Sequence, residues 1–162
     1  MDFTLKNRQS IIDFDGAIKR IVLPKLFPPE QRFGFDENQR QLLLRYMRIM
    51  PRQSTYPLYA EQDYPDSYVK YFMFGCQLQR IPDHINYYNK NGQAYGHVID
   101  GAYIEDTKEG IAFFLTAVIY TNENQILNDD TCETDTIGQP FMRELGDLIY
   151  NYQLDLKRTQ QN

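Results

Sequence analysis

The residues with the clearest potential for chemistry are Lys90, Asn91 and Gly92, which follow a candidate strand at residues 84–89. A lysine at the end of a strand provides a fixed cation for an anionic group. A glycine beside it lets another backbone lie close, because no Cβ intervenes. The tripeptide alone occurs in many turns, so an edge-strand lysine next to a turn glycine is the alternative interpretation.

Other reactive side chains do not form a recognisable site. His84 and His97 are separated along the chain and lack an obvious third ligand, so we expect no metal site. Cys76 and Cys132 are too few for a disulfide framework and do not have metal-type spacing. We therefore expect neither a metal nor a cofactor.

The composition is that of one ordinary globular domain spanning residues 1–162. Hydrophobic residues make up 42% of the chain and charged residues 24%, and the formal net charge is -5. An acidic chain is a poor partner for nucleic acid or an anionic membrane, because both bind basic surfaces. No apolar run approaches the roughly 18 residues of a membrane span, and residues 1–10 lack the features of an export signal.

Three helices are expected from apolar spacing and end signals. Residues 10–23 have helical spacing that stops at Pro24, and Asp36 with Gln39 forms a capping-box pattern that opens a helix through about Met50. A third helix is expected over residues 139–157. Its predicted buried stripe consists of Phe141, Leu145, Leu148, Ile149 and Tyr152.

The strands are expected mainly in residues 93–122. Two runs rich in β-branched and aromatic residues flank the polar turn 107–110, which predicts an antiparallel hairpin of residues 94–105 and 111–121. The second run is nearly continuously apolar, so we expect it to be central to the core, with Phe114 and Val118 buried. The fold class is therefore α+β, with an antiparallel sheet of about three strands and flanking helices.

The order of these features resembles a known family. The segments that carry the resemblance are MPRQSTYP, YPDSYVKYFMFG, NKNGQAYG, AYIED, AVIYTN, NDD, and IGQPF followed by LGDLIYNYQ. Together they resemble the C-terminal part of the β-lactamase-related, penicillin-recognising serine hydrolases, especially those of Bacteroides-type bacteria. The resemblance covers roughly residues 40–155. In that family a Lys-Thr-Gly strand beside the active site precedes two antiparallel strands and a C-terminal helix.

The resemblance implies roles for four residues on a β-lactam or D-Ala-type peptide. Lys90 and Asn91 would face the substrate carboxylate, although Asn91 replaces the family hydroxyl with an amide. Gly92 would let the substrate lie against the strand, and the backbone N–H of Gln93 would be one donor of the oxyanion hole. Lys90 and Gln93 are thus the catalytic candidates, and Asn91 and Gly92 the substrate-binding candidates.

The nucleophile of the family is expected to be missing from this chain. Ser67 and Lys70 have the Ser-x-x-Lys spacing. In the family, however, a whole helical subdomain separates that motif from the Lys-x-Gly strand, and here Lys70 is close in sequence to Lys90. We therefore do not expect Ser67 to be the nucleophile, and we expect the isolated chain to be inactive.

An alternative of another class stays open, namely a non-catalytic binding or assembly module. Its surface would be the tyrosine-rich stretch 55–72, within a long irregular segment. If strands are missing from the fold, the strand 111–121 has an open edge, which predicts a homodimer, coverage by the N-terminal segment, or aggregation. The family works outside the cytoplasm, but the residues predict no compartment for this chain.

Overall fold

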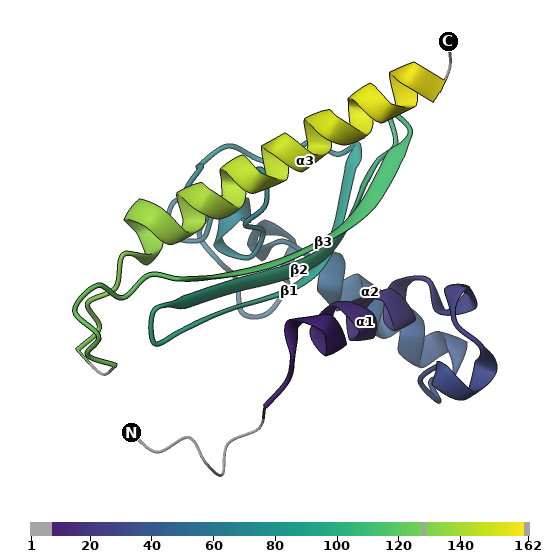
Figure 1. The fold of residues 1–162 in the computed structure, drawn as a ribbon, viewed down its shortest axis with the longest axis horizontal. Helices are drawn as coiled ribbons and strands as arrows, with labels where there is room; N and C mark the ends of the chain where they lie inside the picture. The colour runs from purple at the N-terminus through teal and green to yellow at the C-terminus, as the bar shows by residue number, and fades with distance from the viewer. Residues whose placement is uncertain (1–7, 128, 161–162) are drawn as a thin grey trace.

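A computed structural model describes residues 8–127 and 129–160 of the chain. In this part of the chain, a three-stranded antiparallel sheet with the order β1-β2-β3 packs against three α-helices (Figure 1). The strands are β1 (Ile85–Ala94), β2 (His97–Asp106) and β3 (Ile111–Tyr120). The helices are α1 (Ile11–Val22), α2 (Glu37–Arg48) and α3 (Gln139–Gln160). The predicted α+β class and number of strands are confirmed.

The predicted hairpin is present as β2 and β3, which pair antiparallel from Asp106 opposite Ile111 to His97 opposite Tyr120. The Asp106 carboxylate closes the turn by accepting hydrogen bonds from the N–H groups of Lys108 and Glu109 at 2.8 and 2.9 Å. A second tight turn at residues 95–96, where both residues have positive φ, joins β1 to β2. The Lys-Asn-Gly tripeptide therefore lies inside a strand and not in a turn.

The expectation that residues 111–121 form the strand most central to the core is wrong, because β2 is more deeply buried than β3. Val98, Ala102 and Ile104 of β2 are fully buried, whereas Val118 of β3 is 44% exposed. Phe114 is only half-buried. An apolar run predicts cover on both faces of a strand. On the face of β3 that carries Phe114 and Thr116, however, α1 contacts these two residues and leaves Val118 exposed.

The two N-terminal helices lie on one face of the sheet, opposite α3 (Figure 1). The N–H of Asp13 donates to the Ser10 hydroxyl at the start of α1, and Asp36 and Gln39 form the predicted capping box of α2. The close approach of α1 to β2 depends on Gly101, where a Cβ would lie 2.4 Å from the Ile18 Cδ1 atom. Packing of both helices therefore places the end of α2 beside β1.

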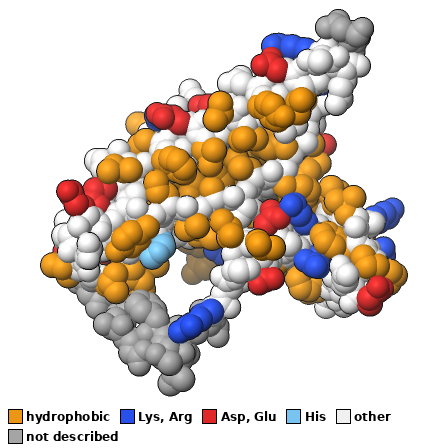
Figure 2. Space-filling view, in the orientation of Figure 1, with side chains coloured by type: hydrophobic (Ala, Val, Ile, Leu, Met, Phe, Trp, Pro, Cys, Tyr) orange, Lys and Arg blue, Asp and Glu red, His pale blue; other side chains and the backbone are white. Residues whose placement is uncertain are grey.

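Helix α3 is rotated from the predicted orientation. Its backbone approaches residues 72–73 so closely at Gly146 that a Cβ there would lie 2.4 Å from the Met73 nitrogen. This contact buries Met142 completely and leaves Leu148 65% exposed. Of the predicted stripe, Leu145 and Ile149 pack on the core, while three other members are exposed, namely Phe141, Leu148 and Tyr152. Figure 2 shows hydrophobic side chains gathered along this helix and the neighbouring sheet.

Candidate functional site

A cavity of about 380 Å³ lies where the end of α2, the segment 50–70 and β1 meet. We call it the tyrosine cavity, because five of its lining residues are tyrosines: Tyr46, Tyr56, Tyr59, Tyr64 and Tyr68. Its other polar lining comes from Ser54, Lys70 and three successive β1 residues, Asn89, Lys90 and Asn91. The volume lies in the range of small-ligand sites.

The aromatic wall of the tyrosine cavity is built by contacts within the irregular segment. The ring of Tyr64 packs edge-on against those of Tyr59 and Tyr68, at centroid distances of 4.9 and 5.0 Å. The buried carboxylate of Asp66 holds the turn that carries Tyr68, by accepting hydrogen bonds from Arg52 Nε at 3.1 Å and from a backbone N–H at 2.9 Å. The wall therefore rests on a buried ion pair as well as on ring packing.

The four residues singled out by the sequence are divided by the structure. Lys90 and Asn91 line the tyrosine cavity, and the exposed Lys90 ammonium donates to the Asn91 carbonyl. Gly92 and Gln93 lie further along β1 and do not line it. A Cβ on Gly92 would meet Ile99 at an ordinary 3.4 Å, so packing does not require glycine there. Lys90 and the tyrosine-rich segment therefore share one cavity, and Gln93 lies outside it.

Ser67 and Lys70 do not form a nucleophile pair. The buried Ser67 hydroxyl donates to the Gln77 carbonyl at 2.7 Å. The Lys70 ammonium donates instead to the Met47 carbonyl at 2.7 Å and to Asn89 Oδ1 at 2.5 Å. This geometry agrees with the expectation that Ser67 is not the nucleophile.

Lys70 belongs to a buried polar network that was not predicted from the sequence. Asn89 Nδ2 donates to Asp100 Oδ1 at 2.8 Å, and the Tyr87 hydroxyl donates to Asp100 Oδ2 at 2.8 Å. The Tyr71 N–H also donates to Asp100 Oδ2, at 3.1 Å. Lys70 and Asp100 are 1% and 0% exposed, so a buried cation and a buried carboxylate are joined through one amide.

Burial controls the titration of this network. It lowers the pKa of Lys70 to about 7, against the opposing charges of Asp100 and Asp66. It also raises the pKa of Asp100 to about 6, although hydrogen bonds from Asn89 and Tyr87 favour the carboxylate. An amine with a pKa near neutrality can accept or donate a proton under ordinary conditions.

Tyr71 is a second buried tyrosine beside Tyr87, and its N–H belongs to the same network. Burial raises the pKa of Tyr71 to about 12, with the side chains of Asn91 and Gln93 close to its hydroxyl. Tyr71 therefore stays protonated at neutral pH, next to the face of β1 that carries Asn91 and Gln93. This contact connects Gln93 to the neighbourhood of the cavity without placing it in the lining.

The remaining candidate ligands do not meet. His84 lies 3.8 Å from Asp106 at one end of β2, and His97 stacks on Tyr120 at the other end. Within residues 8–127 and 129–160, no three histidine, cysteine, aspartate or glutamate side chains are grouped to hold a metal ion. Of the helices in that part of the chain, none has the length and hydrophobicity needed to cross a bilayer.

Comparisons of the chain with protein-family models, with curated proteins and with solved structures found no match. The functional argument therefore rests on the cavity and its chemistry.

Proposed function

We propose that this chain is the C-terminal part of a β-lactamase-like serine hydrolase and supplies the Lys90 wall of its substrate site. The observation that carries the proposal is the tyrosine cavity, in which Lys90 and Asn91 lie beside the tyrosine-rich segment. The substrate is a β-lactam or a D-Ala-type peptide, each of which has a carboxylate next to the amide that is cleaved. Lys90 attracts that carboxylate, and the Asn91 amide donates to it.

The surroundings of Lys90 support recognition of such a substrate. Tyrosine rings offer apolar faces for the body of the ligand and hydroxyls for its polar groups. Gly92 leaves room for a substrate backbone along β1, and the Gln93 N–H is the proposed donor to the oxyanion. Gln93 lies outside the cavity lining, so this donor role requires the substrate to extend along the strand.

The nucleophile comes from another polypeptide segment in this proposal. Two serines lie near the cavity in the described residues, and both hydroxyls are engaged. Ser54 donates to the Pro57 carbonyl at 2.7 Å, and Ser67 donates to the Gln77 carbonyl at the same distance. The chain alone is therefore expected to bind substrate weakly and not to hydrolyse it.

Acylation by a fluorescent penicillin tests the proposal. The chain alone should remain unlabelled, and addition of an upstream segment carrying Ser-x-x-Lys should produce labelling on that segment. Lys90→Ala should reduce the labelling rate at least about tenfold, because it removes the cation facing the carboxylate. Lys108→Ala, an exposed lysine in the β2–β3 turn, is the matched control and should leave the rate unchanged. Equal rates in both variants would refute the role of Lys90.

A non-catalytic assembly module is the second candidate, favoured by an unpaired and uncharged strand edge. Within the described residues β3 pairs only with β2, and its ten residues Ile111–Tyr120 include no charge. Helix α3, which contacts β3, also exposes the apolar side chains of Phe141, Leu148 and Tyr152. A homodimer formed through this edge would appear as twice the monomer mass in light scattering, with slow hydrogen exchange at residues 111–121. A monomer with fast exchange there would exclude it.

A further inference from the structure

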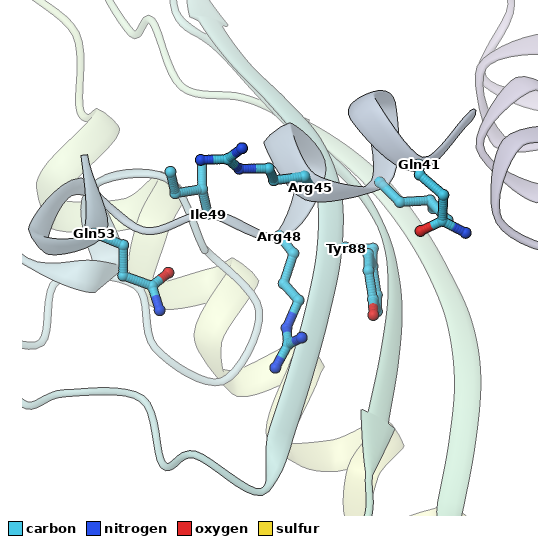
Figure 3. A pocket seen from close by; sticks show the side chains of 7 residues that line it. Gln41, Arg45, Arg48, Ile49, Gln53 and Tyr88 are labelled. Atoms are coloured by element: carbon cyan, nitrogen blue, oxygen red, sulfur yellow. The ribbon is translucent and has the colours of Figure 1, made fainter. Parts of the chain in front are cut away.

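A second hollow, of about 490 Å³, lies at the C-terminal end of α2 (Figure 3). We call it the arginine hollow, because Arg45 and Arg48 of α2 line it. Gln53 follows the helix and Tyr88 comes from β1. No lining residue is acidic, although the whole chain carries a net charge of -5. A concentration of donors and cations without carboxylates favours an anionic ligand.

The guanidinium groups of the two arginines differ from those of Arg52 and Arg80, because within the described residues they make no ion pair or hydrogen bond. Arg52 binds the Asp66 carboxylate, and Arg80 binds both carboxylate oxygens of Glu61. The guanidinium of Arg48 contacts only an aromatic ring, with its Cζ 6.0 Å from the Tyr88 centroid. Asp83 shares a neighbouring hollow with Arg48 without pairing with it. Both guanidinium forks are therefore available to an incoming carboxylate or phosphate.

The donors of the arginine hollow are directed by local structure. Figure 3 shows Arg48 extending between Gln53 and Tyr88, whereas Arg45 extends over Ile49. The Gln53 side-chain oxygen accepts the Met50 N–H at 3.0 Å. That bond fixes the amide and leaves the Gln53 NH₂ group as a donor beside Arg48. An anion between Arg48 and Gln53 would thus meet donors from two different elements.

Tyr88 gives the hollow a fixed, flat wall. The strand register places Tyr88 opposite Tyr103, and Tyr103 opposite Phe114. The three rings form a row with centroid distances of 6.2 and 4.8 Å. Because cross-strand packing holds the ring of Tyr88, a flat apolar group can stack there at little entropic cost.

We propose that the arginine hollow binds a small organic anion. Its carboxylate or phosphate group lies against Arg48 and Gln53, with Arg45 adding charge, and its apolar body lies against Tyr88. This site goes beyond the proposed hydrolase function and is separate from the tyrosine cavity, with which it shares Ile49. The competing explanation is that Arg45 and Arg48 only stabilise the negative end of the α2 dipole.

Titration of the full chain with phenyl phosphate, benzoate and uncharged benzyl alcohol tests the site by NMR and calorimetry. At least one of the two anions should bind saturably, with chemical-shift changes at Arg48, Gln53 and Tyr88, and benzyl alcohol should not bind. The comparison between phenyl phosphate and benzoate identifies the preferred anionic group. Raising the salt concentration should weaken binding, because exposed charges are screened.

Variants separate binding from helix stability. Arg45→Ala/Arg48→Ala should weaken anion binding at least about tenfold, as expected for loss of charge-assisted hydrogen bonds. Arg158→Ala removes an exposed arginine from the last turn of another helix and should leave binding unchanged. The affinity is read from the chemical shifts of Arg48, Gln53 and Tyr88, which line the arginine hollow and not the tyrosine cavity. Absence of saturable binding below about 10 mM, or unaltered affinity in the double variant, would overturn the proposal.

Discussion

Asp100→Asn should be among the most damaging substitutions that preserve side-chain size. The carboxylate accepts hydrogen bonds from Tyr87, Asn89 and the Tyr71 N–H, and the residue is fully buried. An asparagine has one oxygen, so its NH₂ group must face a donor and leave at least one of these groups unsatisfied, at about 1–3 kcal/mol. It also removes the charge that faces Lys70. Asp100→Asn should therefore lower the unfolding free energy by at least about 1–3 kcal/mol.

Urea unfolding followed by circular dichroism at pH 7 measures this loss, and a double-mutant cycle with Lys70→Met isolates the coupling. The double variant should lose less than the sum of the single variants, by about 0.5–3 kcal/mol, because neither buried charge remains without its partner. Glu144→Gln, an exposed α3 carboxylate, serves as the control and should change stability by less than about 0.5 kcal/mol. A loss below about 1 kcal/mol for Asp100→Asn, or strict additivity in the cycle, would refute the reasoning.

Three further predictions test the titration and the packing. Between about pH 7 and 10 the unfolded chain keeps the Lys70 proton that the folded chain has lost, because burial lowers the pKa of Lys70 to about 7. The wild-type unfolding free energy should therefore rise with pH more steeply than that of Lys70→Met, and equal slopes in urea titrations would contradict this. Ile104→Ala should cost about 2–5 kcal/mol, whereas Val118→Ala should cost much less because Val118 is 44% exposed; thermal melts that rank them the other way would disprove the strand order. Gly101→Ala should destabilise by about 1–3 kcal/mol through overlap with α1, and Gly92→Ala, which meets only an ordinary contact, is its control in the same melts.

Local signals in the sequence predicted the elements well. The Asp36–Gln39 box marked the start of α2, and both of its expected hydrogen bonds form. The polar turn between β2 and β3 was equally clear. The Asp106 carboxylate accepts a backbone N–H of the turn, and Gly110 adopts a positive φ, which few other residues do readily. These features depend on neighbours in the chain, so they can be read without the tertiary structure.

Features that depend on packing were predicted less well. The apolar run of β3 indicated the most buried strand, but burial depends on which strand is paired on both sides, which periodicity does not reveal. The stripe on α3 was misjudged because the buried face is set by the close approach at Gly146. Lys70 and Asp100 did offer a signal, since each interrupts an apolar run. Their connection through Asn89, across 30 positions of the sequence, could not be inferred from spacing alone.

The position of Lys90 in the candidate site was predicted only in part. The sequence placed it directly after a candidate strand, and the structure puts it within β1, in the same cavity as the tyrosine-rich segment. The extension of β1 to Ala94, with Gly92 and Gln93 outside the lining, was not predicted, because the turn chemistry lies at residues 95–96.

The last turn of α2 has a thermodynamic consequence for the two hollows. Ile49 lines both of them, and the Met47 carbonyl just before it accepts the Lys70 hydrogen bond. A ligand that shifts this turn in one hollow also alters the other hollow and the environment of the Lys70 proton. Linkage then requires reciprocity: whatever factor one ligand applies to the affinity of the second, the second applies to the affinity of the first.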